Sequence, residues 1–256
     1  MSVLPLRRLL PALLFFFLLC PHAGAVLSDD PGLDDTWKLV TDRKGIQVFM
    51  RHGDDSRLKT FRGVMRMPLR DEYAMLALYN DYDNYPQWLH LVDGASELGR
   101  DTPLRRRLRF TTHLPWPLSD REALLEADMS MHITPEDEHV IVLLNNKPEL
   151  LPANDDYIRF PELEGLFRIK RLSPGEVEIT YQLVLDPGGY IPSWLVNMLL
   201  RDTPYFTLAK LRRIIVQSEY QGLYFPYLDL MGPGRPKDIP PVKSYIYQQT
   251  GAASHR

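Results

Sequence analysis

A change of hydrophobic period at Asp186-Pro187-Gly188-Gly189 constrains the fold more than any other feature of this sequence. Before it, residues 121–132 and 177–185 alternate apolar and polar side chains, which is typical of half-buried strands. After it, residues 192–220 place their apolar side chains mainly on one broad helical stripe, which Pro204 should kink or divide. The pattern predicts an antiparallel sheet with one apolar face, followed by a long amphipathic helix.

The first part of the chain carries shorter signals of both kinds. Residues 37–49 break at the turn-like cluster 42–45, which we interpret as lying between a helix end and a strand. Residues 59–67 predict another strand, and the acidic pair Asp71-Glu72 favours a helix start. Shorter strand signals follow at 139–144, 157–160 and 166–172. The chain is therefore predicted to be an α+β protein.

Residues 1–25 have the pattern of an export signal. Arg7 and Arg8 precede the apolar run Leu9–Cys20, and Ala23-Gly24-Ala25 has the small-x-small form of a cleavage site. A membrane-spanning helix needs about 20 apolar residues, so this run is short for one. An uncleaved anchor, or a lipoprotein in which Cys20 carries the lipid, are the alternatives. We expect cleavage and export to the periplasm.

Removal of this segment changes the charge and the cysteine count. The loss of two arginines lowers the formal net charge from −3 to −5 and removes the single cysteine. A mildly acidic protein is a poor partner for nucleic acid, and no internal disulfide is expected. We predict a signal peptide at 1–25, a domain at 26–220 and a proline-rich tail at 221–256. A monomer is expected.

The sequence lacks the usual catalytic signatures. There is no Gly-x-Ser-x-Gly, no phosphate-binding loop and no Cys-x-x-Cys. His113, His132 and His139 could converge in space, but surface or strand-edge positions are the simpler interpretation. We assign no catalytic residue, and we expect neither a metal nor a cofactor.

The densest charge cluster is Arg105-Arg106-Arg107-x-Arg109. On a strand, Arg105, Arg107 and Arg109 share the solvated face, and Arg106 points toward the apolar face. A buried cation there must find a carboxylate, carbonyl groups or a ligand head group. A register error or a bulge would return Arg106 to solvent.

The loop at residues 114–122 places two prolines around Trp116, which makes it stiff and apolar. It is either a packed hairpin corner or a binding element. The methionine-rich strand 127–131 and the Trp194/Met198 face of the helix are likewise either core or pocket lining. One amphipathic helix laid on a curved sheet can enclose a cavity, which favours the pocket.

Two motifs carry a resemblance to a known family. Pro115-Trp116-Pro117-Leu118-Ser119-Asp120-Arg121, followed by Asp186-Pro187-Gly188-Gly189-x-Ile191-Pro192-x-Trp194-Leu195-x-Asn197, resembles the START lipid-transfer domain, especially its exported bacterial members. Residues 37–220 are covered. The resemblance implies a helix-grip fold, in which a curved antiparallel sheet wraps around a long C-terminal helix and encloses a hydrophobic tunnel. Glu122 departs from the aspartate common in the family but retains the acid.

The resemblance also implies roles for residues around the tunnel. Asp120 and Arg121 are alternatively structural, tying the loop to the sheet by an ion pair. The candidate ligand-binding residues are the lid residues Trp116, Pro117 and Leu118, the helix-wall residues Trp194, Met198 and Phe206, the strand residues Leu125 and Met129, and the polar residues Arg106, Arg121 and Tyr181.

The main hypothesis is a periplasmic protein that binds or transfers a lipid, or another hydrophobic small molecule, without catalysis. It would touch a membrane surface transiently. The runner-up is a helix-grip enzyme of the cyclase or hydrolase type, acting on an apolar substrate in the same cavity. A third hypothesis is an envelope module whose groove binds a protein.

Overall fold

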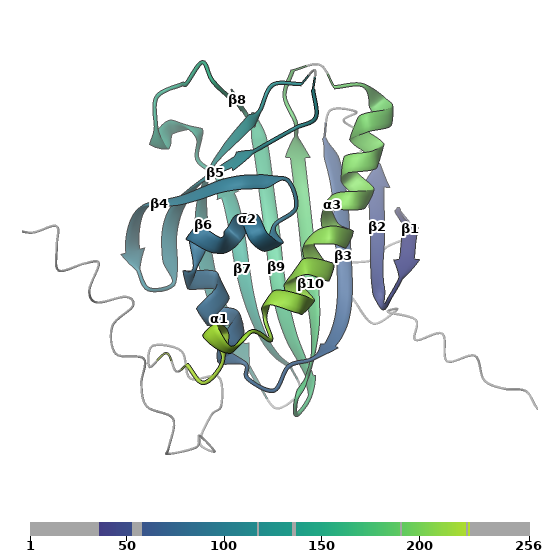
Figure 1. Cartoon of the computed structure of the whole chain (residues 1–256), viewed down its shortest axis with the longest axis vertical. Helices are drawn as coiled ribbons and strands as arrows, with labels where there is room; N and C mark the ends of the chain where they lie inside the picture. Colours follow the sequence, from purple (N-terminus) through teal and green to yellow (C-terminus); the bar gives the residue numbers. More distant parts are fainter. Residues whose placement is uncertain are drawn as a thin grey trace, which may run out of the picture. The chain divides into compact units, whose positions relative to one another are not determined.

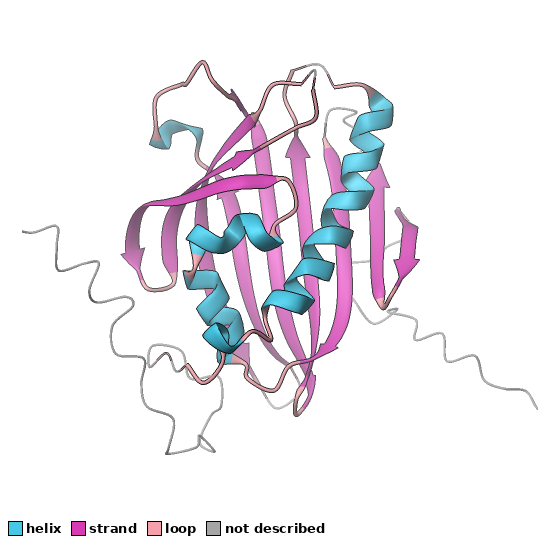
Figure 2. Ribbon diagram, viewed as in Figure 1, coloured by secondary structure: helices cyan, strands magenta, loops and turns pink. Residues whose placement is uncertain are grey.

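An antiparallel sheet forms the framework of the protein (Figures 1 and 2). The computed structural model describes residues 36–52, 58–116, 118–134, 137–189, 191–223 and 225, all within the unit Asp35–Arg256. Over these residues the strand order is β1-β2-β3-β10-β9-β7-β6-β5-β4, and the short β8 pairs in parallel with β6. The predicted signal peptide, and most of the predicted tail, lie outside the described residues.

The helices and strands follow the predicted α+β order. The strands are β1 (Trp37–Arg43), β2 (Ile46–His52), β3 (Lys59–Pro68), β4 (Val92–Thr102), β5 (Arg105–Thr112), β6 (Arg121–Ile133), β7 (Glu138–Asn146), β8 (Ile158–Arg159), β9 (Glu162–Ser173) and β10 (Glu176–Asp186). The α-helices are α1 (Tyr73–Asn80), α2 (Tyr85–Trp88) and α3 (Ser193–Ile214), and short 3₁₀ turns occupy Tyr82–Asn84, Pro148–Leu150 and Ser218–Tyr220.

Residues 37–43 correct the first of the predicted elements. They form the edge strand β1 rather than a helix end, and they pair with β2 in an antiparallel hairpin. The hairpin turns at Lys44 and Gly45, whose φ angles of 53° and 71° are those of a two-residue turn with both central residues left-handed. None of the side chains of this edge strand is fully buried, so apolar and polar residues alternate only weakly along it, which explains the wrong assignment.

Helix α3 lies against β2 and β3 on the inner face of the sheet (Figure 1). It remains one helix through Pro204, so the predicted division does not occur. Gly63 on β3 allows this contact, because a Cβ atom there would lie 2.9 Å from Leu208 Cδ1 and 3.0 Å from Pro204 Cβ. Close packing of the helix on the strand therefore offsets the stability lost with the backbone hydrogen bond that the proline cannot make.

Strand β6 confirms the predicted alternation on its inner face only. Ala123, Leu125 and Met129 are buried there, but Glu122 and Leu124 on the opposite face are buried as well. The segment that leads into β8 accounts for this, since Arg159 binds Glu122 through Nη2 at 2.7 Å and is itself held by the carbonyls of residues 148, 151 and 152. Glu122 and Arg159 thus form a small, largely buried polar cluster on the outer face of the sheet.

Candidate functional site

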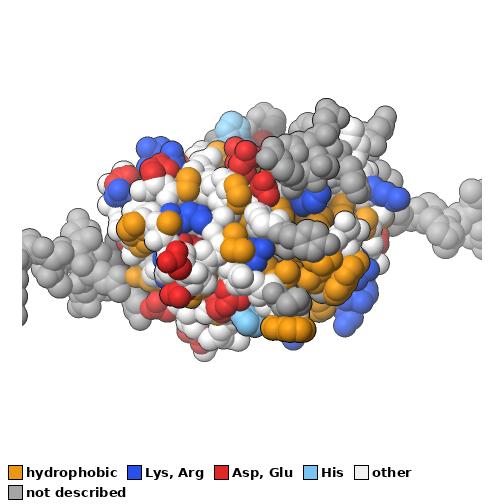
Figure 3. Space-filling model, turned by 90° about the horizontal axis from the view of Figure 1, so that it is seen from above, with side chains coloured by type: hydrophobic (Ala, Val, Ile, Leu, Met, Phe, Trp, Pro, Cys, Tyr) orange, Lys and Arg blue, Asp and Glu red, His pale blue; other side chains and the backbone are white. Residues whose placement is uncertain are grey.

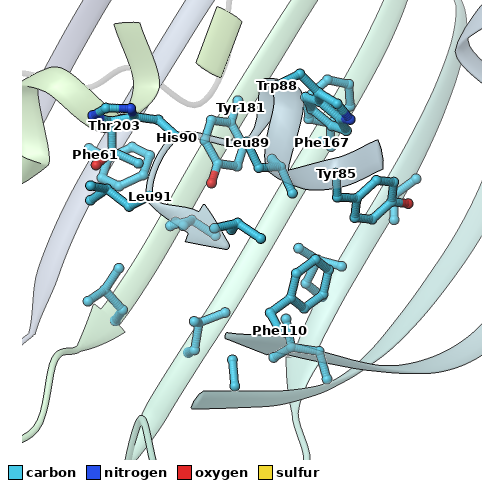
Figure 4. Close-up of a pocket in the computed structure, with 18 of the residues that line it drawn as sticks. Phe61, Tyr85, Trp88, Leu89, His90, Leu91, Phe110, Phe167, Tyr181 and Thr203 are labelled. Atoms are coloured by element: carbon cyan, nitrogen blue, oxygen red, sulfur yellow. The ribbon is translucent and has the colours of Figure 1, made fainter. Parts of the chain in front are cut away.

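A cavity of about 270 Å³ lies between the inner face of the sheet and the helices (Figure 4). This is just below the roughly 300–1,000 Å³ typical of small-molecule pockets. Its lining is mostly apolar and comes from strands β3 to β7, β9 and β10, from α1 and α2 with the turn that follows, and from α3. Helix α3 contributes Val196, Leu199, Leu200 and Thr203. The lining therefore suits an apolar guest.

A row of aromatic rings crosses the cavity (Figure 4). Phe110 stacks on Tyr85 with ring centroids 5.8 Å apart, and Tyr85 meets Trp88 edge-on at 5.4 Å. Phe167 contacts Trp88 at 6.1 Å and Tyr181 at 6.0 Å. Such contacts fix the rings in place and contribute roughly 0.5–1.5 kcal/mol a pair beyond their burial. The cavity wall is thus preformed at its centre.

Tyr181 brings a polar atom to this apolar centre. Its hydroxyl points into the cavity (Figure 4), and it has no hydrogen-bond partner among the described residues. Burial raises the pKa of Tyr181 above its ordinary value, so the group stays a neutral hydroxyl. It can donate one hydrogen bond to a guest and accept others.

Arg121 occupies the end of the cavity where β10 stops. Its side chain is buried, and its guanidinium donates to the carbonyls of Ser119, Pro187 at 3.2 Å and Gly188 at 3.1 Å. Burial lowers the pKa of Arg121 from its ordinary value, and the nearby Asp120 charge opposes this. The carbonyls satisfy N–H groups without neutralising the cation.

The end of the cavity near the start of β7 carries a different arrangement. Arg171 is ion-paired with both Glu72, just before α1, and Glu138 on β7, and all three residues line the cavity. His139 lines the same end, and its Nδ1 lies 3.1 Å from Asp137 Oδ2. The two carboxylates here neutralise Arg171 within the protein.

His90 lines the cavity beside α3. Burial lowers the pKa of His90 below its ordinary value, Lys210 acts in the same direction, and Asp202 opposes them. Its ring centroid lies 5.1 Å from that of Phe206. The imidazole is therefore held mainly in the neutral form near neutral pH.

The comparisons with known proteins agree on one family. An uncharacterized protein of Pseudomonas aeruginosa is 32% identical over 196 residues, which is 74% of this chain and 89% of that protein. A crystal structure of a STAR-related lipid transfer protein from Xanthomonas axonopodis is 29% identical, with a TM-score of 0.63 over 72% of this chain and 100% of that one. The chain belongs to the START domain family.

More distant START proteins are similar to this chain in sequence or in fold. The phosphatidylcholine transfer protein of Bos taurus is 22% identical over 65% of this chain and 78% of its own length. The crystal structure of human STARD10 has a TM-score of 0.60 at 18% identity, over 73% of this chain and 76% of that one. No protein-family model matches the chain. The expected helix-grip architecture, a curved antiparallel sheet with a long C-terminal helix, is confirmed.

The START cavity contains four of the predicted ligand-binding residues. Arg121, Leu125, Met129 and Tyr181 all line it. Alternation along β6 and β10 placed Leu125, Met129 and Tyr181 on this face, and contact of each of the four with a ligand remains a prediction.

The predicted helix wall needs correction. Trp194 and Phe206 are exposed and lie outside the cavity lining, which α3 supplies through residues 196–203 instead. Large aromatic residues on both sides of α3 blur its amphipathic stripe, so the sequence did not show which side faces inward. Met198 lies on α3, but its side chain is outside the described residues.

Arg106 is buried as the alternation predicted, yet it lies outside the cavity lining. Its Nη2 donates to Asn80 Oδ1 at 2.7 Å, its Nη1 lies 3.9 Å from Glu97 Oε2, and its guanidinium carbon lies 4.1 Å from the centre of the Tyr79 ring. The protein therefore supplies partners for both terminal nitrogens, while Nε has no hydrogen-bond partner among the described residues. Contact of Arg106 with a ligand remains a prediction.

The predicted lid loop is exposed at its tip. Trp116 is 92% exposed and Leu118 is partly buried, both outside the cavity lining, and Pro117 lies outside the described residues. Asp120 ties the base of the loop together, since its Oδ1 accepts from the Leu114 N–H at 3.2 Å and lies 3.1 Å from His113 Nδ1. Asp120 and Arg121 thus both hold the loop, each through partners of its own.

Two features of the site were missed by the sequence reasoning. Tyr85, Trp88 and His90 come from residues 80–91, which have no clear period and were left unassigned. Asp93, His113 and Asp120 bring ligand-type atoms within 4.8 Å of one another at the base of the loop. Asp93 and His113 are exposed and Asp120 is already bonded, so this cluster does not by itself indicate a metal.

Proposed function

We propose that this protein binds a lipid or another hydrophobic small molecule in its internal cavity and carries or senses it in the cell envelope. The observation that carries the proposal is the preformed, aromatic-lined cavity between the sheet and α3, with few polar groups. The names of the START relatives, which include a phosphatidylcholine transfer protein, support lipid binding in general.

The energetics of such a cavity suit a carrier. Each methylene group that leaves water gains about 0.8 kcal/mol. A bilayer offers nearly the same gain, so exchange between membrane and cavity is close to balanced for the apolar part of the guest. Selectivity then depends on shape and on the few polar groups that face the guest, Tyr181 and Arg121 among them.

Two exposed tryptophans favour contact with a membrane at the Arg121 end. Trp116 is 92% exposed in the loop that precedes Arg121, and Trp194 is 69% exposed two residues before the cavity residue Val196. Figure 3, which views the molecule from this end, shows hydrophobic side chains gathered on part of its surface. Tryptophan is favoured at membrane–water interfaces, so we propose that this end docks transiently on a bilayer.

The proposal includes export to the periplasm, action as a monomer and binding without catalysis. The N-terminal export pattern of the sequence supports the first part. Among the described residues, no helix combines the length and the apolar character needed to cross a membrane.

Mass spectrometry of lipid extracted from the purified protein tests the binding proposal. Val142 and Leu143 are neighbours on β7 that point to opposite faces, and they are 6% and 44% exposed. Val142→Phe fills the cavity and should lower the bound lipid, whereas the matched control Leu143→Phe should not. Wild-type protein that never carries or takes up an apolar molecule would overturn the proposal, and chemical turnover of the guest would favour the enzyme alternative.

Transfer between vesicles tests the docking proposal. Trp116→Ala should slow the transfer of a fluorescent lipid several-fold and change stability by no more than about 0.5 kcal/mol, because the ring is exposed. Leu39→Ala on the edge strand β1 is the control, since Leu39 is also exposed. Equal transfer rates in the two variants would refute docking through Trp116.

A further inference from the structure

The two ends of the cavity differ in charge. Arg121 and Lys59 line the end near the last residues of β10, and Lys59 pairs with Leu185 across the strands. Arg171, Glu72 and Glu138 line the other end, where Arg171 pairs with Val177. Leu185 and Val177 are eight residues apart on β10, about 26 Å along an extended strand. Among the residues that line the cavity, the charged groups at the first end are cationic, and those at the other end include more carboxylates than arginines.

Arg121 keeps donors free for a guest. A guanidinium has five N–H groups, and the three carbonyls of Ser119, Pro187 and Gly188 each accept one. The other two have no partner among the described residues. Gly189 lies beside the guanidinium, because a Cβ atom at that position would be in ordinary van der Waals contact with Nη2 at 3.7 Å. All three bonded partners are neutral, so the buried cation has no directly bonded anion among the described residues, although the Asp120 charge lies nearby.

We propose that the guest is a single-chain amphiphile whose ionised carboxylate or phosphate binds Arg121, with its apolar chain running past the aromatic rings toward Arg171. This inference rests on the proposed function and deepens it by naming the class of ligand. A cavity of about 270 Å³ fits one chain better than two. The planar fork of arginine suits carboxylate and phosphate oxygens, and such charge-assisted hydrogen bonds are stronger than neutral ones.

The opposite end fixes the direction of the guest. Arg171 is already paired with two carboxylates, so an anionic head group placed there would meet more negative charge than positive. At the Arg121 end it would meet a cation held by neutral carbonyls. Between the two, the Tyr181 hydroxyl offers a hydrogen bond to a hydroxyl, ester or keto group part-way along the chain.

Calorimetric titration of the wild-type protein with four matched probes is the first test. Dodecanoate and dodecyl phosphate, below their micellar concentrations, should bind about tenfold or more tightly than dodecanol and methyl dodecanoate. Inorganic phosphate and acetate should not bind at millimolar concentration. Equal affinity for charged and neutral probes overturns the inference and leaves the proposed function standing, whereas no binding of any amphiphile overturns both. Binding of inorganic phosphate as tight as that of dodecyl phosphate would reveal a free-anion site instead and overturn the inference.

Paired variants locate the head group. Arg121→Gln should abolish the preference for charged probes, and Arg171→Gln, the matched control at the other end, should keep it. If Arg121→Gln does not fold, carbon-13 NMR of carboxyl-labelled dodecanoate bound to the wild-type protein decides. A carboxylate at Arg121 should stay ionised to lower pH than free dodecanoate in water. A bound carboxyl group that protonates at higher pH than the free acid overturns the inference.

Discussion

The two arginines at the ends of the cavity are held in opposite ways. Arg121 is buried and bonded to backbone carbonyls, whereas Arg171 is partly exposed and paired with Glu72 and Glu138. Carbonyls anchor a guanidinium but leave its charge available, and carboxylates neutralise it. Arginine therefore has two different roles. Arg121 presents a charged group to the guest at one end, whereas Arg171 links secondary-structure elements through ion pairs at the other.

Replacing Arg121 should have the largest effect on stability. Arg121→Met leaves three carbonyl groups at the loop base and after β10 without their donor. Leaving a buried polar group unpaired costs about 1–3 kcal/mol, so a loss of about 3–5 kcal/mol is expected. Urea unfolding measures it. A loss below about 1 kcal/mol would mean that water hydrogen-bonds to these carbonyls in place of Arg121. The two arginines would then not differ in their contribution to stability.

The corresponding change at the other end should cost much less. Arg171→Met removes ion pairs whose side chains are partly exposed, and such pairs contribute about 0–1 kcal/mol. The wild-type advantage should shrink further as salt is added. Unfolding curves at low and high ionic strength check both statements. A loss in the free energy of unfolding equal to that of Arg121→Met would show that the two arginines contribute to stability in the same way.

Tyr181 lies between the two ends of the cavity. Its replacement measures what an unpaired buried hydroxyl costs in stability. Because its hydroxyl has no partner among the described residues, Tyr181→Phe should leave stability unchanged or raise it by up to about 1 kcal/mol. The thermal midpoint of the ligand-free protein measures this effect. A clear loss of stability would indicate that a bound water already satisfies the hydroxyl.

His90 gives the smallest expected effect, and it depends on pH. Its pKa is lowered in the folded state by burial and by Lys210, so the unfolded chain binds its proton more readily. The neutral His90 thus contributes its full stability above the unfolded pKa of about 6.5 and loses it as pH falls through the lower folded value. Unfolding of wild type and His90→Gln from pH 7 to pH 5 should show a steeper decline for the wild type. Parallel curves would contradict the prediction.

The strands were predictable where their pattern is local. Alternation at 121–132 and 177–185 located β6 and β10 and the inward face of Leu125, Met129 and Tyr181. It could not predict the burial of Glu122, because its partners Arg109 and Arg159 reach it from other segments. Burial raises the pKa of Glu122, but the hydrogen bonds and the charges of these two arginines together outweigh it and lower the pKa overall.

The site was predictable only as far as periodicity sets a direction. A strand has two faces, so one apolar face defines which side chains point inward. A helix with large apolar residues such as Trp194 and Phe206 on its exposed side has no such clear division, and the inward face of α3 was misjudged. The bonding of Arg121 to Pro187 and Gly188 joins positions more than sixty residues apart. No local pattern carries that information.

The row of rings across the cavity also makes the fluorescence of the protein sensitive to a bound guest. Tyr85 and Phe167 lie against Trp88, which is buried and lines the cavity. Light absorbed by the neighbouring tyrosine can pass to this indole, and the colour of indole emission depends on the polarity around it. A guest that enters the cavity changes that polarity, so its arrival and departure can be followed from the protein's own fluorescence without any added label.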